Sequence, residues 1–202
     1  MPDLTLFHTA EVHVTTFAAL APSADLQQVV RSDWLERAQQ GIPPELEQEI
    51  TAAIQATSGP VLCTCTTLGE VAEKAGATRL DWPMMQEAAR IGGPVLMAYC
   101  LDSTAAPSTV LLRRAFTDLD KEPELRSLPL TGLWGHFTEG DNKRFEAEIA
   151  TWISTSLKML PDTSCVVLAQ ASMAGAAEIL QRQTAIPILA SPAIAMKHLL
   201  GE

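Results

Sequence analysis

The side chain best suited to catalysis in this sequence is the thiol of Cys65. It follows an expected buried strand and precedes an expected helix, in the stretch Cys65-Thr66-Thr67. The start of a helix carries partial positive charge that stabilises a thiolate, which is the form that acts as a base or a nucleophile. We therefore expect a lowered pKa for Cys65. Cys63 lies one step deeper on the same face of the strand and is expected to pack beside it.

The helix after Cys65 carries a start signal. Thr67 and Glu70 have the spacing of a capping box, in which Thr67 caps the helix and Glu70 reaches back. The alternative interpretation is that Cys63 and Cys65 are both small buried apolar residues, as free cysteines often are. Two further cysteines, Cys100 and Cys165, lie inside apolar strands and are expected in the core.

Small polar side chains, most of them hydroxyls, follow the expected strands. Ligands in open α/β sheets bind beyond the carboxyl ends of the strands, where helix amino termini point at them. This set suits a carboxylate held by hydroxyl groups and backbone amides. The candidate binding residues are His8, Thr9, Thr66, Thr67, Ser103, Thr104, Gln170, Ser172 and Ser191.

Other common site chemistries lack their motifs. The Cys63 and Cys65 pair has no second cysteine pair at zinc spacing, so we expect no metal. No glycine-rich phosphate loop follows a strand, and no G-x-S-x-G elbow of a serine hydrolase occurs. We therefore expect no cofactor. His8, at the end of the first strand, is a candidate to orient a substrate or share a proton.

Composition narrows the class of protein further. The chain has 202 residues, is 47% hydrophobic and 19% charged, and carries a net charge of -10, which disfavours a nucleic-acid partner. The apolar stretch 185–195 is broken by Pro187 and Pro192, so no membrane span is expected. The start at Met1 shows no secretion-signal pattern, and four cysteines are too few for a disulfide scaffold. These features predict a cytoplasmic globular protein.

Short apolar strands alternate with helical patterns along the chain. This alternation predicts an α/β fold with mainly parallel sheets, because parallel neighbours need a helical crossover. Tryptophans 34, 82, 134 and 152 are expected in the core, and 134–142 is expected to form a loop. The expected strands are 4–7, 60–65, 95–101, 128–133, 165–169 and 186–190. The expected helices are 24–40, 44–56, 68–75, 84–91, 108–119, 143–160, 174–183 and 193–200.

A weak internal repeat organises these elements. The segment 61–73 aligns with 166–178, strand on strand and helix on helix, so that Cys65 corresponds to Gln170 and Thr67 to Ser172. The repeat predicts two pseudo-symmetric α/β lobes, each a mainly parallel sheet flanked by helices, with the site in the cleft between them. The expected first lobe is 1–92 plus 185–202, and the second is 93–184.

Four strand ends, in this order, resemble the aspartate/glutamate racemase superfamily, which includes hydantoin racemases, maleate isomerases and arylmalonate decarboxylases. They are Cys65-Thr-Thr67, Leu101-Asp-Ser-Thr104, Val167-Leu-Ala-Gln-Ala-Ser-Met173 and Pro187-Ile-Leu-Ala-Ser-Pro192. The resemblance implies cofactor-independent chemistry beside a carboxylate, with one cysteine from each lobe flanking the substrate carbon. Cys65 matches the first cysteine. Gln170 stands in place of the second, and glutamine does not exchange a proton at neutral pH.

Three functions follow from this resemblance. The leading hypothesis is an isomerase or racemase of a small carboxylate, an amino acid or a dicarboxylic acid, with Cys65 as acid/base or nucleophile and His8 or water as the second proton carrier. The second is a one-cysteine decarboxylase, and the third is a non-catalytic carboxylate-binding protein. The sequence leaves a homo-oligomer open.

Overall fold

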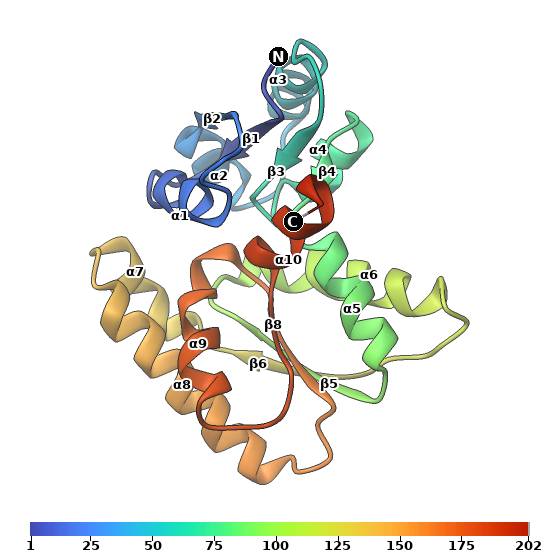
Figure 1. The fold of residues 1–202 in the computed structure, drawn as a ribbon, viewed down its shortest axis with the longest axis vertical. Helices are drawn as coiled ribbons and strands as arrows, with labels where there is room; N and C mark the ends of the chain where they lie inside the picture. Colours follow the sequence, from blue (N-terminus) through green and yellow to red (C-terminus); the bar gives the residue numbers. More distant parts are fainter. Residues whose placement is uncertain (202) are drawn as a thin grey trace.

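The chain folds into two lobes, each built on a four-stranded parallel sheet (Figure 1). The structure is a computed structural model and describes residues 1–201. The strand orders β2-β1-β3-β4 and β6-β5-β7-β8 are the same when the second half is matched to the first, which confirms the expected two-lobed α/β fold. The strands are β1 Leu4–His8, β2 Leu26–Val30, β3 Val61–Cys63, β4 Thr78–Arg79, β5 Pro94–Tyr99, β6 Glu124–Pro129, β7 Cys165–Leu168 and β8 Ile188–Ala190.

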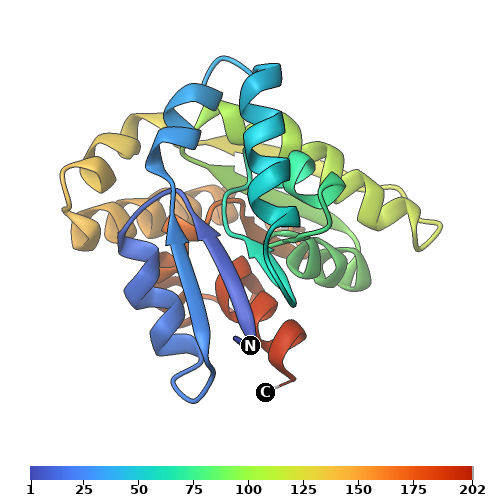
Figure 2. The ribbon, with the colours of Figure 1, turned by 90° about the horizontal axis from the view of Figure 1, so that it is seen from above.

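Helices cover both faces of each sheet (Figures 1 and 2). In the first lobe, α2, α3 and α4 pack on one face, and α1 and α10 pack on the other. The helices are α1 Val12–Leu20, α2 Ser32–Ala38, α3 Pro44–Gln55, α4 Gly69–Lys74, α5 Trp82–Ile91, α6 Asp102–Thr117, α7 Trp134–Thr138, α8 Asn142–Met159, α9 Gly175–Gln181 and α10 Ser191–Leu200. Two short 3-10 turns, η1 Thr131–Leu133 and η2 Ala171–Met173, complete the second half.

The strands of the second sheet are nearly continuous apolar runs in the sequence, and the packing of the sheet explains this pattern. Side chains alternate between the two faces of a strand, and both faces are covered. Along β5, Val95 and Met97 pack against α5 and α6, whereas Leu96 and Ala98 pack against α8 and α9. Cys100 and Cys165 are buried in these two clusters, as expected.

Several elements differ from those expected. The segment 26–30, expected within a helix, is the edge strand β2, and 12–20 is the helix α1, for which no element was expected. Both have mixed apolar and polar patterns, because an edge strand and a short helix each bury only part of their surface. Strand β6 spans Glu124–Pro129, whereas the strand expected in this region was 128–133, so the observed strand lies earlier in the chain. Trp152 is 54% exposed on α8 and does not belong to the core.

The expected lobe boundaries differ from the sheet pairing in two segments. Strand β8 pairs with β7, so 188–190 belong to the second sheet and not to the first lobe. Helix α5 also packs into the second lobe, through Met84, Met85, Ala88 and Ala89. Helix α10 packs on the first sheet, as expected for the end of the chain, and lies between the two lobes in Figure 1.

A buried ion pair stands where the chain crosses from the first lobe to α5. The guanidinium of Arg79, at the end of β4, donates two hydrogen bonds to the carboxylate of Asp81, at 3.0 and 2.9 Å. The two residues are only 5% and 1% exposed. Arg79 also lies against Gly69 at the start of α4, where an added Cβ would come within 2.7 Å of Nε. The pair therefore supports the chain segment that leads from Cys65 into α4.

Candidate active site

A cavity of about 450 Å³ opens between the lobes, at the carboxyl ends of the central strands. In the first sheet the chain passes from the central strand β1 outward to β2 on one side, and from the central strand β3 outward to β4 on the other. The second sheet is arranged in the same way. The loops that follow two such central strands separate and leave a crevice. Seven of the residues expected at the site line this cavity: Thr9, Cys65, Thr66, Thr67, Thr104, Gln170 and Ser172.

The thiol of Cys65 lies in the cavity wall and is 8% exposed. Burial raises its pKa above the ordinary value, which is opposite to the expected direction. Three hydrogen bonds oppose this effect: the hydroxyl of Thr9 and the backbone amides of Leu68 and Thr67 all favour the thiolate. The expected amide environment is present, but removal of the sulfur from water has the larger effect. The thiol is therefore protonated at neutral pH.

The expected capping box does not form. Helix α4 begins at Gly69 without a side-chain cap, and Glu70 instead forms an exposed ion pair with Lys74 at 2.8 Å. The hydroxyl of Thr67 turns toward the other lobe and lies 3.3 Å from the hydroxyl of Ser103. Its neighbour Thr66 likewise donates a hydrogen bond to the carbonyl oxygen of Ala169, at 3.1 Å. The two threonines therefore join the lobes beside Cys65.

Gln170 occupies the position in the second lobe that Cys65 occupies in the first. Each stands two residues beyond the end of its strand, β7 or β3. The side-chain oxygen of Gln170 accepts hydrogen bonds from the backbone amides of Cys100 and Leu101, at 2.6 and 3.0 Å. These bonds hold the carbonyl end against the loop after β5. The NH₂ end is then the donor that remains for a ligand in the cavity.

Two further hydroxyl residues of the second lobe line the cavity. Thr104 lies in the first turn of α6 and is buried. The hydroxyl of Ser172, on η2, is buried and has no hydrogen-bond partner among residues 1–201. A buried hydroxyl without a hydrogen-bond partner lowers the stability of the protein. A ligand that accepts a hydrogen bond from this hydroxyl removes that cost.

Three expected site residues do not line the cavity. His8 is fully buried, and its two ring nitrogens lie 2.8 Å from the Thr64 hydroxyl and 2.9 Å from the Gln28 side-chain oxygen. Burial lowers its pKa, so the ring is neutral at pH 7. Ser103 contacts Thr67, and Ser191 is buried at the start of α10. His8 therefore holds β1, β2 and the loop after β3 together, beneath the cavity.

The sequence reading missed His13 and the aromatic wall of the cavity. His13, on α1, lines the cavity, and burial lowers its pKa to about 4. Trp134 and Phe137 line the cavity from the second lobe. They lie on helix α7, in a segment that was expected to be a loop. A helix that starts soon after β1 would have pointed to His13, but the segment 12–20 shows no clear apolar face.

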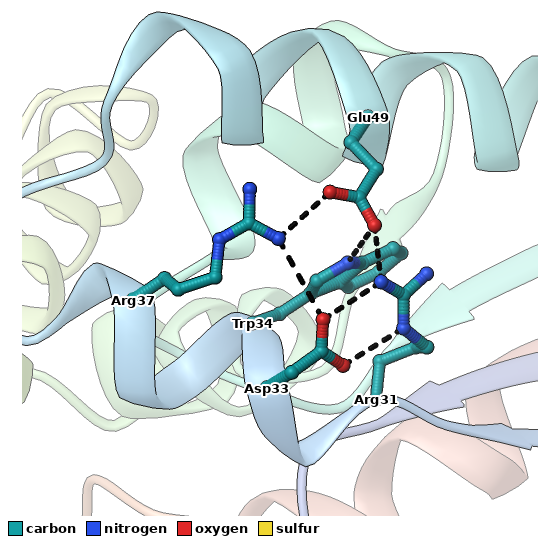
Figure 3. A network of polar contacts seen from close by, with 5 residues as sticks. All are labelled: Arg31, Asp33, Trp34, Arg37 and Glu49. Carbon is teal, nitrogen blue, oxygen red and sulfur yellow. Dashed lines mark hydrogen bonds and ion pairs between the residues drawn. The ribbon is translucent and has the colours of Figure 1, made fainter.

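Helix α2 forms another wall, through Ser32, Leu35, Glu36 and Gln39. A network of polar contacts fixes this helix to α3 (Figure 3). The carboxylate of Glu49 accepts hydrogen bonds from Arg31, from Arg37 at 2.8 Å and from the indole of Trp34 at 3.1 Å. These donors, Arg31 first, lower the pKa of Glu49 to about 2.

Replacement of Glu49 by glutamine tests this network. A carboxyl group whose pKa is lower in the folded than in the unfolded chain stabilises the fold above its unfolded value, and this contribution is lost as the pH falls toward its folded value. The unfolding free energies of the parent and Glu49→Gln should therefore differ at neutral pH and converge as the pH falls from 4.5 to about 2. Urea unfolding at several pH values measures this. Glu47→Gln, on the same helix, is the control, and its unfolding free energy should follow that of the parent across this pH range. A difference between Glu49→Gln and the parent that stays constant with pH would contradict the assignment.

Within residues 1–201, histidine, cysteine, aspartate and glutamate side chains form no group of three or more that could hold a metal ion. Over the same residues, no helix has the length and apolar character of a membrane span. The polar side-chain groups among the lining residues are hydroxyls, amides, one thiol, one imidazole and the carboxylate of Glu36.

Comparison with solved structures gives matches along nearly the whole chain. An aspartate racemase homologue from Pyrococcus horikoshii OT3 gives a TM-score of 0.66 at 13% identity, covering 100% of this chain and 98% of that chain. A glutamate racemase from Francisella tularensis, in complex with D-glutamate, gives 0.69 at 12% identity, covering 98% and 79%. An arylmalonate decarboxylase gives 0.57 at 11% identity, covering 98% and 91%.

At these identities the similarity is one of fold. No protein-family model matches the sequence, and no curated protein matches it. The chain therefore shares the two-lobed fold of these racemase and decarboxylase structures, the fold that the resemblance of its strand ends implied.

Proposed function

We propose that this protein is a cofactor-independent, racemase-like enzyme that exchanges the proton on the carbon next to a carboxylate. The observation that carries the proposal is the position of Cys65: its thiol lines the cavity between the lobes, together with Thr9, Thr66 and Thr67. A thiol that alternates between thiol and thiolate can remove and return a proton within reach of it. Structural neighbours that are racemases support this class of reaction.

In the proposed step the Cys65 thiolate takes the proton of the substrate carbon. The carbon–hydrogen bond breaks, a sulfur–hydrogen bond forms, and the electron pair moves onto the carboxylate oxygens as an enediolate. Return of the proton from sulfur to the same face regenerates the substrate and the thiolate. Delivery of a proton by water to the opposite face gives the other enantiomer and hydroxide, which takes the proton from the Cys65 thiol and restores the thiolate. His8, the other candidate for that delivery, is fully buried and does not line the cavity, which favours water.

The carboxylate is proposed to bind beside Gln170 and the hydroxyls of Thr104 and Ser172, whereas the Thr66 hydroxyl already donates to the carbonyl oxygen of Ala169. Hydroxyl and amide donors that are already in place stabilise negative charge as it develops on the oxygens. The Ser172 hydroxyl supports this assignment because it is buried and has no partner among residues 1–201. Ser103 and Thr67 are proposed to hold the lobes at the spacing that this grip requires.

Decarboxylation is the second candidate, and the protonated state of Cys65 favours it. Burial raises the pKa of this thiol, so that at neutral pH it is ready to donate a proton. In this reaction the carbon–carbon bond to one carboxylate breaks, CO₂ leaves, and the thiol protonates the resulting enediolate. A single proton donor is sufficient, which fits a glutamine at the position of Gln170.

Incubation with amino, hydroxy and dicarboxylic acids in heavy water tests the proposal. Proton exchange at the carbon next to the carboxylate, followed by NMR, should appear for at least one acid, and CO₂ release from a substituted malonate would instead favour decarboxylation. Saturable binding without exchange or CO₂ release would contradict both and leave the carboxylate-binding protein.

A further inference from the structure

The cavity combines a polar end with an aromatic wall, and this division points to the class of substrate. The hydroxyl and thiol groups come from the strand ends, as described above. The wall comes from α1 and α7, with His13 in one lobe and Trp134 and Phe137 in the other. A ligand that fills both parts needs one polar end and one flat apolar end.

The aromatic wall is held in place by the core of the second lobe. The ring of Phe137 lies 4.8 Å from that of Trp134 and 5.4 Å from that of Phe145, measured between centroids. Phe145 is fully buried, whereas Phe137 is only partly buried. Across the lobes, the His13 ring lies 6.4 Å from that of Phe137, with 28° between the planes. Rings fixed in this way offer a flat surface at little cost in side-chain entropy.

The charge of the cavity limits the ligand further. No lysine or arginine belongs to the lining within residues 1–201, and Glu36 contributes a carboxylate. His13 adds no positive charge at pH 7, because burial lowers its pKa to about 4. A second carboxylate on the ligand would meet no cation and would be repelled by Glu36, which also disfavours the malonate that the decarboxylase alternative requires.

We propose that the substrate is a monocarboxylic acid that carries a flat ring, bound with the ring against Phe137 and the carboxylate at the hydroxyl residues. The inference rests on the proposed function, since the reacting carbon would lie between these two ends, next to Cys65. The cavity volume of about 450 Å³ accommodates a ring, whereas a small aliphatic acid would leave that part of the cavity unfilled.

Two matched pairs of acids test the substrate class: phenylglycine against alanine, and mandelate against lactate, each differing by phenyl in place of methyl. Titration calorimetry should show binding of the phenyl acids at least about tenfold tighter, with glutamate no better than alanine. Phe137→Leu should reduce the phenyl preference severalfold, and Phe137→Tyr, which keeps the ring, should retain it. Trp152→Leu, an exposed aromatic residue outside the cavity, is the control and should leave the preference unchanged.

Equal or weaker binding of the phenyl acids by the parent chain, or a preference that Phe137→Leu leaves intact, would overturn the substrate class. The parent-chain comparison decides this even where a variant fails to fold. Heavy-water exchange on the same acids separates the two proposals. Exchange of aliphatic acids without a phenyl preference leaves the proposed function standing, whereas a phenyl preference in binding without exchange or CO₂ release supports the ligand class and contradicts the proposed function.

Discussion

Replacement of Cys65 by alanine is expected to reduce the rate of heavy-water exchange about 10²- to 10⁴-fold, the range that a positioned acid or base contributes. Among the cysteines of residues 1–201, Cys65 alone lines the cavity. Removal of its sulfur leaves the cavity and the hydroxyl residues in place, so binding of the carboxylate should survive. NMR exchange rates and titration calorimetry on the same variant measure the two effects separately.

Cys165→Ala is the matched control for this variant. Cys165 is a fully buried thiol in β7 and lies outside the cavity lining, so its loss should lower stability and leave exchange unchanged. Equal losses of exchange in the two variants would mean that the Cys65 effect is structural.

The pH profile gives an independent check on Cys65. Because burial raises the pKa of this thiol, the thiolate fraction of the free protein should rise throughout the neutral range. The exchange rate per unit of substrate, kcat/KM, should therefore increase with pH between about pH 6 and pH 9 if the thiolate removes the proton. A rate that stays flat over this range would instead indicate that the protonated thiol acts, as in the decarboxylase alternative, because a thiol with a raised pKa remains protonated.

Replacement of Asp81 by alanine is expected to lower the free energy of unfolding by about 3–5 kcal/mol, the cost of leaving one partner of a buried ion pair alone. Its partner Arg79 is 5% exposed and would keep its charge without a carboxylate in contact. Urea unfolding followed by circular dichroism measures the change. A loss below about 1 kcal/mol, the value of an exposed pair, would contradict the assignment.

Two variants separate the buried charge from a general effect of substitution. Glu70→Ala removes an exposed pair with Lys74 and should cost well under 1 kcal/mol. The double variant Arg79→Leu and Asp81→Leu removes both charges and should be more stable than Asp81→Ala, because no unpaired charge remains. Since Arg79 packs against Gly69 after the Cys65 loop, Asp81→Ala should also weaken exchange at temperatures where it stays folded.

The sequence alone determined the architecture of this protein and the part of its cavity that the strand ends form. Continuous apolar strands that alternate with helices permit few arrangements other than parallel sheets covered on both faces, and the match of Cys65 to Gln170 implied two equivalent lobes. Residues at the ends of central strands, such as Thr9 and Ser172, could be placed at the cavity because the carboxyl ends of parallel strands meet at one edge.

The tertiary structure decided what the local pattern could not. The pKa of Cys65 moves opposite to the expectation, because the net effect depends on how far the surrounding chain removes the sulfur from water, which the residues next to Cys65 in sequence do not specify. His8 ends the first strand and His13 follows five residues later, yet only His13 of the two lines the cavity, since His8 turns to Thr64 and Gln28. The aromatic wall arises from packing of Phe137 on Phe145, a contact between helices that neither residue's neighbours in sequence specify.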